Sequence, residues 1–476
     1  MVNTNPGVSV SLRASSQSIV HGCPGVPRSI PRIETVVELR PVNGRPFHLR
    51  AVVIELRTIQ KISVPTTLGS QDTFREYKVY EDVVFSPTVG SFSQELLGVD
   101  IPILFTIPRE ISSSGMAPLW SASVSHRLCV KVFLGNSYNA ETTHMETFPV
   151  VIKLYDTLPL YRQYNEPLVR QVISPDNQVE VNLLMPITAV GPKDIFSIDV
   201  SIKANALHNR VSKFLKLKEL TFQIKEILEC HEGGLPARKE AKLLSDHKDF
   251  SGIKEKLTSS QSIRCQFNVA FPVENDSLHI YDSSRSNNDD TGNFNHNSNY
   301  YGNLEYNSQN NITEDAFSGL DGLGSSSSAT VTSANIAKYN IMDKLDEGIP
   351  LTHVQGFTSS GKLFSLRYEV VLKIKLAHSK DMDLRIPLTV SPFDRKSSAY
   401  LLNWIKKECE MAAQLFGREM VNWFIQNESR ANDILRKRYL APPILYKNTR
   451  NDWIRLGFNG DAFGGRHPSK MVEYID

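Results

Sequence analysis

Apolar and polar residues alternate near the start of the chain in a way that predicts two β-strands. Ile33, Val37 and Leu39 fall on one face of a segment whose other face is charged, which is the period of a half-buried strand. Residues 41–46, PVNGRP, supply turn residues and predict a hairpin. The apolar run 51–54 then moves the buried face, which predicts a bulge or a strand covered on both sides. Residues 32–60 therefore predict a β-sandwich.

The same two-residue period recurs along much of the chain. Further strands are predicted at 99–107, 125–134, 148–155, 179–184, 195–204 and 214–229, with two long ladders at 366–376 and 384–390. Short strands at this spacing, separated by turn residues, are typical of sandwiches and not of alternating strands and helices. The pattern therefore predicts an all-β fold.

Some segments break this pattern. Residues 1–25 are polar and we expect them to be disordered, and so is the Asn/Ser-rich stretch 275–335, which cannot bury enough apolar surface to fold alone. Residues 396–438 change to helical periodicity, with Ser397 or Ser398 as the expected cap. The expected buried stripe of this helix contains Leu402, Ile405, Cys409, Ala412, Phe416 and Met420. Residues 439–476 are expected to form an irregular tail.

Composition narrows the class of protein. The 476 residues give room for two or three domains, and 53 basic against 51 acidic residues leave a net charge of +2, which gives no support for a nucleic-acid partner. The five cysteines lie far apart, so we expect reduced thiols and neither a zinc site nor a disulfide scaffold. The first residues show no apolar signal segment, and no apolar run approaches the ~20 residues of a membrane span. A cytoplasmic protein is therefore expected.

Candidate chemistry is sparse. Residues 356–362, GFTSSGK, have the glycine and lysine spacing of a phosphate-binding loop, but Leu363 stands where Ser or Thr should bind Mg²⁺. A strand ladder follows where that loop needs a helix, so a hairpin turn is the better interpretation. No HExxH or GxSxG spacing and no nucleophile–base pair stands out, so we predict no catalytic residue, no cofactor and no metal site.

Two tyrosine motifs and one lysine cluster are candidate binding sites. Leu158-Pro159-Leu160-Tyr161 is an LPxY segment, and Pro442-Pro443-Ile444-Leu445-Tyr446 has one residue too many for PPxY. Extended proline segments of this kind bind the aromatic grooves of WW domains, although short motifs also occur by chance. The lysines at positions Lys213, Lys216, Lys218 and Lys225 are suited to an anionic membrane or a phosphorylated partner; the simpler alternative is a solvated or edge-protecting face.

The N-terminal half resembles the arrestin fold, in particular the fungal arrestin-related (α-arrestin) group. The resemblance is carried by residues 31–60, by 100–108 (DIPILFTIP) before a Ser-rich break, by 126–134 and by 148–152. In the C-terminal half, residues 194–204, 214–230 and 366–390 resemble the second arrestin sandwich. The similarity extends over about residues 30–395, and it is diffuse, without an invariant signature. The chain departs from the group in having no true PPxY motif.

The resemblance implies two tandem arrestin-like sandwiches, residues 26–165 and 166–395, the second one interrupted by the Asn/Ser-rich insertion. The helix lies outside this pair and is expected to dock on the second sandwich or to meet a partner. The implied function is that of a non-enzymatic cytosolic adaptor that recognises the tails of membrane cargo proteins. Such adaptors recruit the WW domains of a HECT-type ubiquitin ligase for endocytosis or sorting at the plasma membrane, Golgi or endosomes. Without PPxY, recruitment would fall to the two tyrosine motifs.

Two other hypotheses remain open. In the first, the chain is an arrestin-like subunit of a trafficking coat or an exchange-factor complex. The helix and tail, with Trp404, Trp423 and Trp453, would then form the interface. The second is a β-sandwich transcription regulator, against which the near-zero net charge counts. An enzyme is the last hypothesis.

Overall fold

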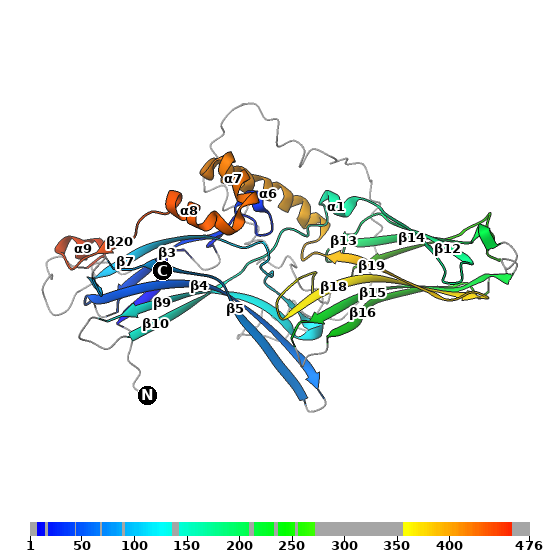
Figure 1. Ribbon diagram of the computed structural model, residues 1–476, viewed down its shortest axis with the longest axis horizontal. Helices are drawn as coiled ribbons and strands as arrows, with labels where there is room; N and C mark the ends of the chain where they lie inside the picture. The colour runs from blue at the N-terminus through cyan, green and yellow to red at the C-terminus, as the bar shows by residue number, and fades with distance from the viewer. Residues whose placement is uncertain are drawn as a thin grey trace, which may run out of the picture. The chain divides into compact units, whose positions relative to one another are not determined.

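The computed structural model describes residues 7–14, 18–42, 44–66, 69–87, 91–135, 142–208, 214–232, 237–252, 256–271 and 356–458. Across these ranges the strands form four sheets, which surround two separate apolar cores (Figure 1). The fold is therefore all-β with a minor helical part, as the alternation predicts. The predicted insertion 275–335 and Lys213 lie outside the described residues.

The first sandwich is built from two sheets that share one core. One sheet contains β1 (Val8–Leu12), β2 (Val20–His21), β3 (Arg32–Pro41), β7 (Gly98–Thr106) and β20 (Ile444–Tyr446). The other contains β4 (Phe47–Thr66), β5 (Gly69–Phe85), β6 (Gln94–Leu96), β8 (Gly115–Ala117), β9 (Ala122–Leu134) and β10 (Thr142–Val150). Ile33 and Val37 from the first sheet meet Ile54 and Leu56 from the second in this core. Apolar side chains from alternate positions of both sheets thus fill one interior.

The predicted hairpin at residues 41–46 is wrong. β3 pairs with β1, β2 and β7, whereas β4 pairs with β5, β6 and β9. The connection therefore crosses from one sheet to the other, because each strand buries one face in the same core from opposite sides. The predicted bulge is confirmed, since the register shifts between Leu49 and Ala51 against β9 and between Val52 and Val53 against β5.

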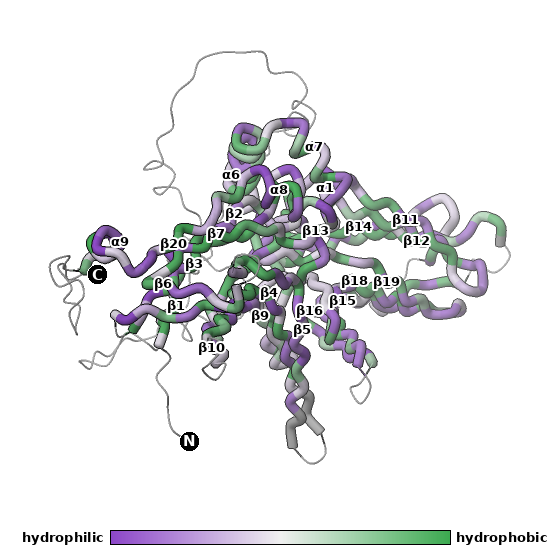
Figure 2. Tube along the Cα trace, turned by 60° about the vertical axis from the view of Figure 1, so that its left-hand side comes forward, coloured by the Kyte–Doolittle hydropathy of each residue, from purple (hydrophilic) through white to green (hydrophobic). Residues whose placement is uncertain are grey.

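The second sandwich has the same two-sheet construction. One sheet has the order β11 (Leu168–Ile173), β12 (Val179–Met185), β14 (Ile195–Ala204) and β17 (Ile263–Ala270). The other has the order β13 (Ala189–Val190), β19 (Met382–Val390), β18 (Phe364–Ala377), β15 (Lys216–Cys230) and β16 (Arg238–Asp249). Phe222 stacks between Phe196 and Phe267, with ring centroids 5.9 and 5.4 Å away, in the centre of the core. The tube in Figure 2 shows the hydrophobic residues alternating along these strands.

The ends of the chain are more ordered than predicted. β1 and β2 lie within the range 1–25 that was expected to be disordered, and both pair with β3. The tail contains β20 and a short helix α9 (Arg450–Arg455), so the prediction of an irregular tail is wrong for these residues. The three missed strands β1, β2 and β20 are short, and none has a long enough alternation to be recognised in the sequence.

The single predicted helix is a series of three. α6 (Arg395–Phe416), α7 (Arg418–Gln426) and α8 (Ala431–Tyr439) are separated at Gly417, whose φ is +84°, and at the 3₁₀ turn Glu428–Arg430. A positive φ favours glycine, so Gly417 ends α6 at little cost. The N-cap is Asp394, whose carboxylate accepts a hydrogen bond from the amide of Ser397 (2.6 Å), and not Ser397 or Ser398.

The helices dock on the first sandwich, so the alternative in which they dock on the second is wrong, and contact with a partner stays a prediction. Most of the predicted stripe is buried, with Leu401 in the place of Leu402 and with Cys409 half-buried. Ala412, Phe416 and Met420 pack against Ile30 and Leu104 of the first sandwich. The Arg32 guanidinium lies 4.9 Å from the centroid of the Phe416 ring, a cation–π contact that adds to this packing.

Candidate interaction surfaces

Strand β7 is buried on both faces. Val99, Ile101 and Phe105 point into the first core. Asp100 and Leu104 point the other way and are still only 2% and 5% exposed, because the tail and the helices cover that face. A strand buried on both faces reads as a nearly continuous apolar run, and this explains the sequence VDIPILFT.

Asp100 fixes the tail to this face. Its carboxylate accepts hydrogen bonds from Arg13 (2.6 Å), from Arg40 (2.6 Å) and from the Tyr446 hydroxyl (3.0 Å). Burial, together with the hydrogen bond to Asp100, raises the pKa of Tyr446. The backbone of β20 meanwhile pairs antiparallel with β7 from Ile444 to Tyr446. A buried carboxylate needs such partners, and here they tie three distant parts of the chain together.

The tail tyrosine motif is therefore divided between surface and interior. Pro442 and Pro443 are exposed, but Tyr446 is 8% exposed and its backbone belongs to the sheet. A WW groove takes proline and tyrosine side chains from one free extended segment. In this fold Tyr446 reaches such a groove only if β20 leaves β7.

The LPxY segment is likewise packed within the chain. Leu158 is fully buried, Pro159 is buried, and the Tyr161 hydroxyl donates to the carbonyl of Tyr155 (2.6 Å). Burial raises the pKa of Tyr161. The Arg395 guanidinium lies near the Pro159 carbonyl, so this segment holds the start of α6. Its role in the described structure is internal packing.

The predicted basic surface does not form one patch. Lys225 donates to Glu240 (2.8 Å), and this lysine with Arg385 and Arg238 lowers the pKa of Glu240 to about 2. Lys225 thus belongs to an ion-pair network on the outer face of β15 and β16. Lys216 and Lys218 instead line an open groove of about 680 Å³ at the end of the second sandwich. Lys375 and Glu219, 2.8 Å apart, lie in the same groove.

A set of buried polar residues, which we call the polar seam, joins the two sandwiches. It is formed by residues near the turn 356–362 and by β4 and β9. Gln60, fully buried, accepts from the amide of Leu363 (2.8 Å) and donates to Ser112 (3.1 Å). Ser112 in turn donates to the carbonyl of Ser360 (2.7 Å). A Cβ on Gly361 would lie 1.8 Å from the Gln60 amide nitrogen, so this glycine serves close packing. The turn interpretation is confirmed by the bridge between Ser359 and Leu366.

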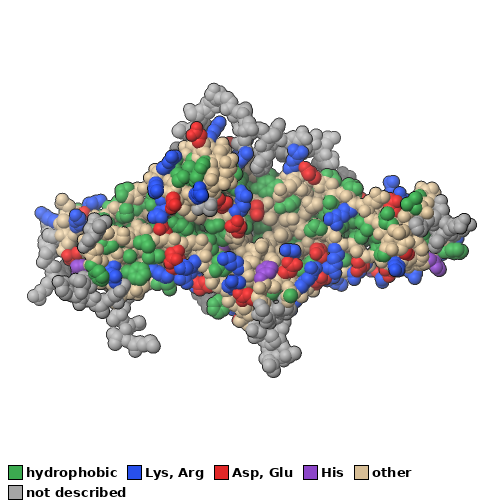
Figure 3. All heavy atoms as spheres, viewed as in Figure 1, with side chains coloured by type: hydrophobic (Ala, Val, Ile, Leu, Met, Phe, Trp, Pro, Cys, Tyr) green, Lys and Arg blue, Asp and Glu red, His purple; other side chains and the backbone are tan. Residues whose placement is uncertain are grey.

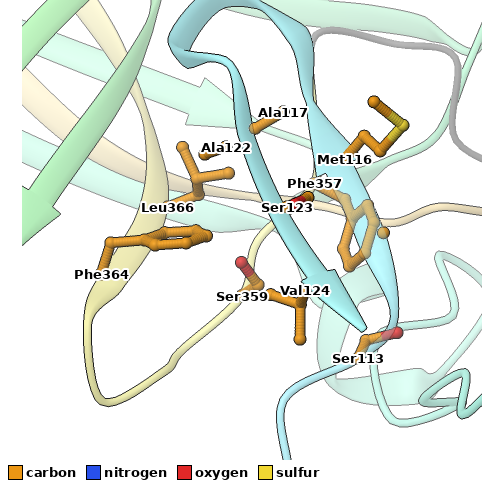
Figure 4. A pocket seen from close by; sticks show the side chains of 11 residues that line it. Ser113, Met116, Ala117, Ala122, Ser123, Val124, Phe357, Ser359, Phe364 and Leu366 are labelled. Atoms are coloured by element: carbon orange, nitrogen blue, oxygen red, sulfur yellow. The ribbon is translucent and has the colours of Figure 1, made fainter. Parts of the chain in front are cut away.

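A second part of the seam surrounds Glu226. The carboxylate is fully buried and accepts hydrogen bonds from the Trp120 indole (2.5 Å) and the Tyr368 hydroxyl (2.6 Å). Figure 4 shows Phe364 and Leu366 beside Ala117 and Ala122 of the neighbouring strands. The cavity between them is about 10 Å³, no more than one water molecule needs, so it holds no small-molecule ligand.

His126 is a second titratable group of this seam. Its Nε2–H donates to the carbonyl of Ser112 (2.9 Å), which leaves Nδ1 to accept from the Thr58 hydroxyl (2.9 Å). Burial lowers the pKa of His126 to about 4, only partly offset by the bond to Ser112. The ring is therefore neutral at pH 7 and satisfied at both nitrogens.

The outer face of the helices is the most accessible apolar surface near this framework. Met411 and Leu415 lie four residues apart on α6 and are 36% and 55% exposed, with Lys407 and Arg418 exposed on either side. Figure 3 shows hydrophobic and basic side chains together over the helical region drawn in Figure 1. We name the four residues Lys407, Met411, Leu415 and Arg418 the helix-face patch.

The tryptophans that the sequence suggested for this interface lie elsewhere. Trp453 is 5% exposed and packs on Phe458. Trp404 packs on Tyr155, and Trp423 lies half-buried against the apolar cluster under the helices. Aromatic size alone does not distinguish an interface residue from an anchor within the chain.

The described part of the chain contains no metal-ligand cluster and no membrane-spanning helix. Within it, no three His, Cys, Asp or Glu side chains gather as metal ligands would. Nor does any helix among the described residues have the length and apolar character to cross a membrane.

Comparison with known proteins gives one relative. No protein-family model matches the sequence. The chain is 24% identical over 508 residues to a protein of Saccharomyces cerevisiae (strain ATCC 204508 / S288c) named "RHO1 GEF localizing protein 1". It is similar to a yeast localizing protein. The match covers 92% of each chain, so the similarity is not confined to one sandwich.

We predict that His126 makes the stability of the seam pH-dependent. Folding lowers the pKa of His126, so below pH 6.5 its imidazole binds a proton in the unfolded chain while it stays neutral in the folded chain. Stability is therefore lost as pH falls from about 6.5 to about 4. Between pH 7 and pH 5 the free energy of unfolding in urea should fall by ~2 kcal/mol more in the wild type than in His126→Gln. Equal losses in both proteins would contradict this assignment.

We predict that removing the Tyr446 hydroxyl loosens the tail. Tyr446→Phe deletes one hydrogen bond to a buried carboxylate, worth ~1.5–3 kcal/mol. Hydrogen exchange at the amides of residues 444–446 should speed up by roughly tenfold or more. Tyr77→Phe, which leaves the contact between the Tyr77 ring and Lys362 in place, is the matched control and should change nothing there. Unchanged exchange in Tyr446→Phe would show that Asp100 does not hold the tail.

Proposed function

We propose that the chain is a non-enzymatic localising adaptor, an arrestin-like scaffold that holds a Rho1 guanine-nucleotide exchange factor (GEF) at its place of action. The observation that carries the proposal is the similarity to "RHO1 GEF localizing protein 1" over 92% of both chains. A two-sandwich scaffold with its helical layer fits such a role. Of the hypotheses from sequence, the subunit of an exchange-factor complex is therefore the one we favour.

The helix-face patch is the surface we assign to the exchange factor. Binding energy at protein interfaces concentrates in a few apolar anchors with a polar or charged rim, and Met411 and Leu415 between Lys407 and Arg418 have this composition. Exposed apolar side chains that adjoin one another are also what a free scaffold must keep for its partner. The cationic rim suits an acidic or mixed-charge surface on the exchange factor.

The patch is held rigidly before any partner binds. At its start, α6 is capped by Asp394, and the Arg395 guanidinium donates to Asn165 (2.6 Å). At its end, Phe416 lies under Arg32, and its carbonyl accepts from the Tyr439 hydroxyl (2.9 Å). A surface fixed at both ends loses little conformational entropy on binding, which favours affinity.

The ubiquitin-ligase adaptor implied by the arrestin resemblance has weaker support. Both tyrosine motifs have buried members, so WW binding would require a segment to detach. Recognition of cargo tails has no assigned surface among the described residues. We keep a cytoplasmic location with peripheral membrane contact as part of the proposal, with the groove around Lys216 and Lys218 as the membrane-facing candidate.

The experiment is capture of a Rho1 GEF from the same fungal source by the immobilised full chain. Met411→Asp combined with Leu415→Asp should weaken capture by about tenfold or more, because it places charges in the apolar centre of the contact. Leu207→Asp is the matched control; Leu207 is 85% exposed, so the same substitution there tests for non-specific effects. A circular dichroism spectrum confirms folding of each variant.

Three outcomes would count against the proposal. If the wild type captures no exchange factor, the function is wrong. If the helix-face variant binds as well as the wild type, the surface is wrong. If Leu207→Asp loses binding equally, the effect is not specific to the helices. Capture of isolated WW domains by the wild type, lost in Tyr161→Ala or Tyr446→Ala, would restore the ligase-adaptor hypothesis.

A further inference from the structure

Strand β11 forms one border of its sheet. Among the described strands it pairs only with β12, and Figure 2 shows the two strands next to each other in the second sandwich. The amide of Ser174 donates to the carbonyl of Val179 (2.8 Å). This bond shows which residues of β11 form hydrogen-bonded pairs with β12. Backbone bonding alternates along such a pair. Residues 168, 170 and 172 therefore bond to β12, and the N–H and C=O groups of residues 169, 171 and 173 point to the free edge.

The free edge of β11 is apolar. Val169 is 68% exposed and Ile173 is 45% exposed, while Leu184, opposite Val169 on β12, is 37% exposed. Within β11 the only charged residue is Arg170. Uncovered edges of this kind invite pairing with another strand, and folded proteins usually guard them with charge.

A comparison with β16 makes the difference clear. β16 borders the other sheet of the same sandwich and carries eight ionisable side chains: Arg238, Lys239, Glu240, Lys242, Asp246, His247, Lys248 and Asp249. Its edge is protected, whereas the edge of β11 is not. Of these two border strands, β16 carries the charges that keep an edge in solvent, whereas β11 is suited to contact with another strand.

We propose that β11 pairs with β11 of a second copy of this chain, antiparallel about a twofold axis at Gln171. In this register Gln171 faces Gln171 of the second copy, and Val169 faces Ile173 of the second copy. All three residues whose backbone groups point outward then form hydrogen-bonded pairs, about six bonds in total. Moving the twofold axis by one residue, to Arg170 or Val172, leaves only two such pairs, so the axis at Gln171 uses the edge best.

The side chains agree with this register. On the outer face, Val169 sits between Leu184 of its own sheet and Ile173 of the second copy, so the exposed apolar residues cover one another. Arg170 lies opposite Val172 of the second copy. With the axis moved to Arg170, this residue would lie opposite Arg170 of the second copy, and like charges directly opposite are destabilising. The strand is thus complementary to itself, as a twofold interface requires.

A cysteine at the axis tests the register. In a hydrogen-bonded antiparallel pair the Cα atoms are ~5.5 Å apart, which a disulfide can span. Gln171→Cys should form a covalent dimer under mild oxidation, visible on a non-reducing gel. Wild type, with its native cysteines, and Arg170→Cys should remain uncrosslinked. Crosslinking of Arg170→Cys but not of Gln171→Cys would overturn the proposed register.

A charge on the edge tests the interface. Sedimentation of the full chain should show a concentration-dependent dimer, and Val169→Lys should raise its dissociation constant by about tenfold or more. Ile195→Lys is the matched control, because Ile195 is 69% exposed on the same sheet but lies on β14, away from the edge. The control should dimerise like the wild type. A wild type that stays monomeric at every concentration would overturn the proposal. This outcome includes the case in which the strand of another protein, and not a second copy, pairs with β11. So would a Val169→Lys dimer as tight as the wild type, or equal loss in both variants.

Discussion

The architecture depends on the burial of β7 on both of its faces. One face belongs to the core of the first sandwich, and the other presents Asp100 and Leu104, which would be costly to leave exposed or unpaired. Residues more than 300 positions away in the sequence cover this face. The Tyr446 hydroxyl donates a hydrogen bond to the carboxylate of Asp100, and the helices pack over Leu104. Thr106 is also held, since Asn432 accepts hydrogen bonds from its amide (2.7 Å) and its hydroxyl (2.9 Å). The C-terminal segment is therefore structurally part of the first sandwich.

This dependence gives the proposed function a physical basis. The helix-face patch lies on helices whose inner face is committed to β7 and to Ile30, so its outer face is free and fixed in position. The seam between the sandwiches adds hydrogen bonds at Gln60, Ser112 and Glu226, each with a partner on the other side, which for Glu226 is the Trp120 indole. Buried polar groups that are satisfied only in one arrangement specify that arrangement. An adaptor that positions a partner benefits from such specification.

Much of the fold could be predicted from the sequence, because alternation with a period of two survives wherever one face of a strand is buried. The ladders at β18 and β19 are examples. Sheet assignment could not be predicted, since β3 and β4 have the same alternation whether they pair or face each other across a core. β16 was missed because charges on both faces hide its period. The surface on which the helices dock could not be predicted from their apolar stripe, because the stripe shows that one face is buried but not which residues it packs against. The burial of the tyrosine motifs could not be predicted for a similar reason, because a short motif carries no sign of its burial.

Hydrogen exchange along the full chain, compared between wild type and Leu104→Asp, asks whether β7 and the C-terminal segment form one unit. A charge at Leu104, beneath the helices, should release α7, α8 and β20 together. Their amides should then exchange much faster, while those of the second sandwich, such as β14 and β18, stay protected. If α7, α8 and β20 instead exchange quickly in the wild type already, or remain protected in Leu104→Asp, the C-terminal segment does not depend on the outer face of β7.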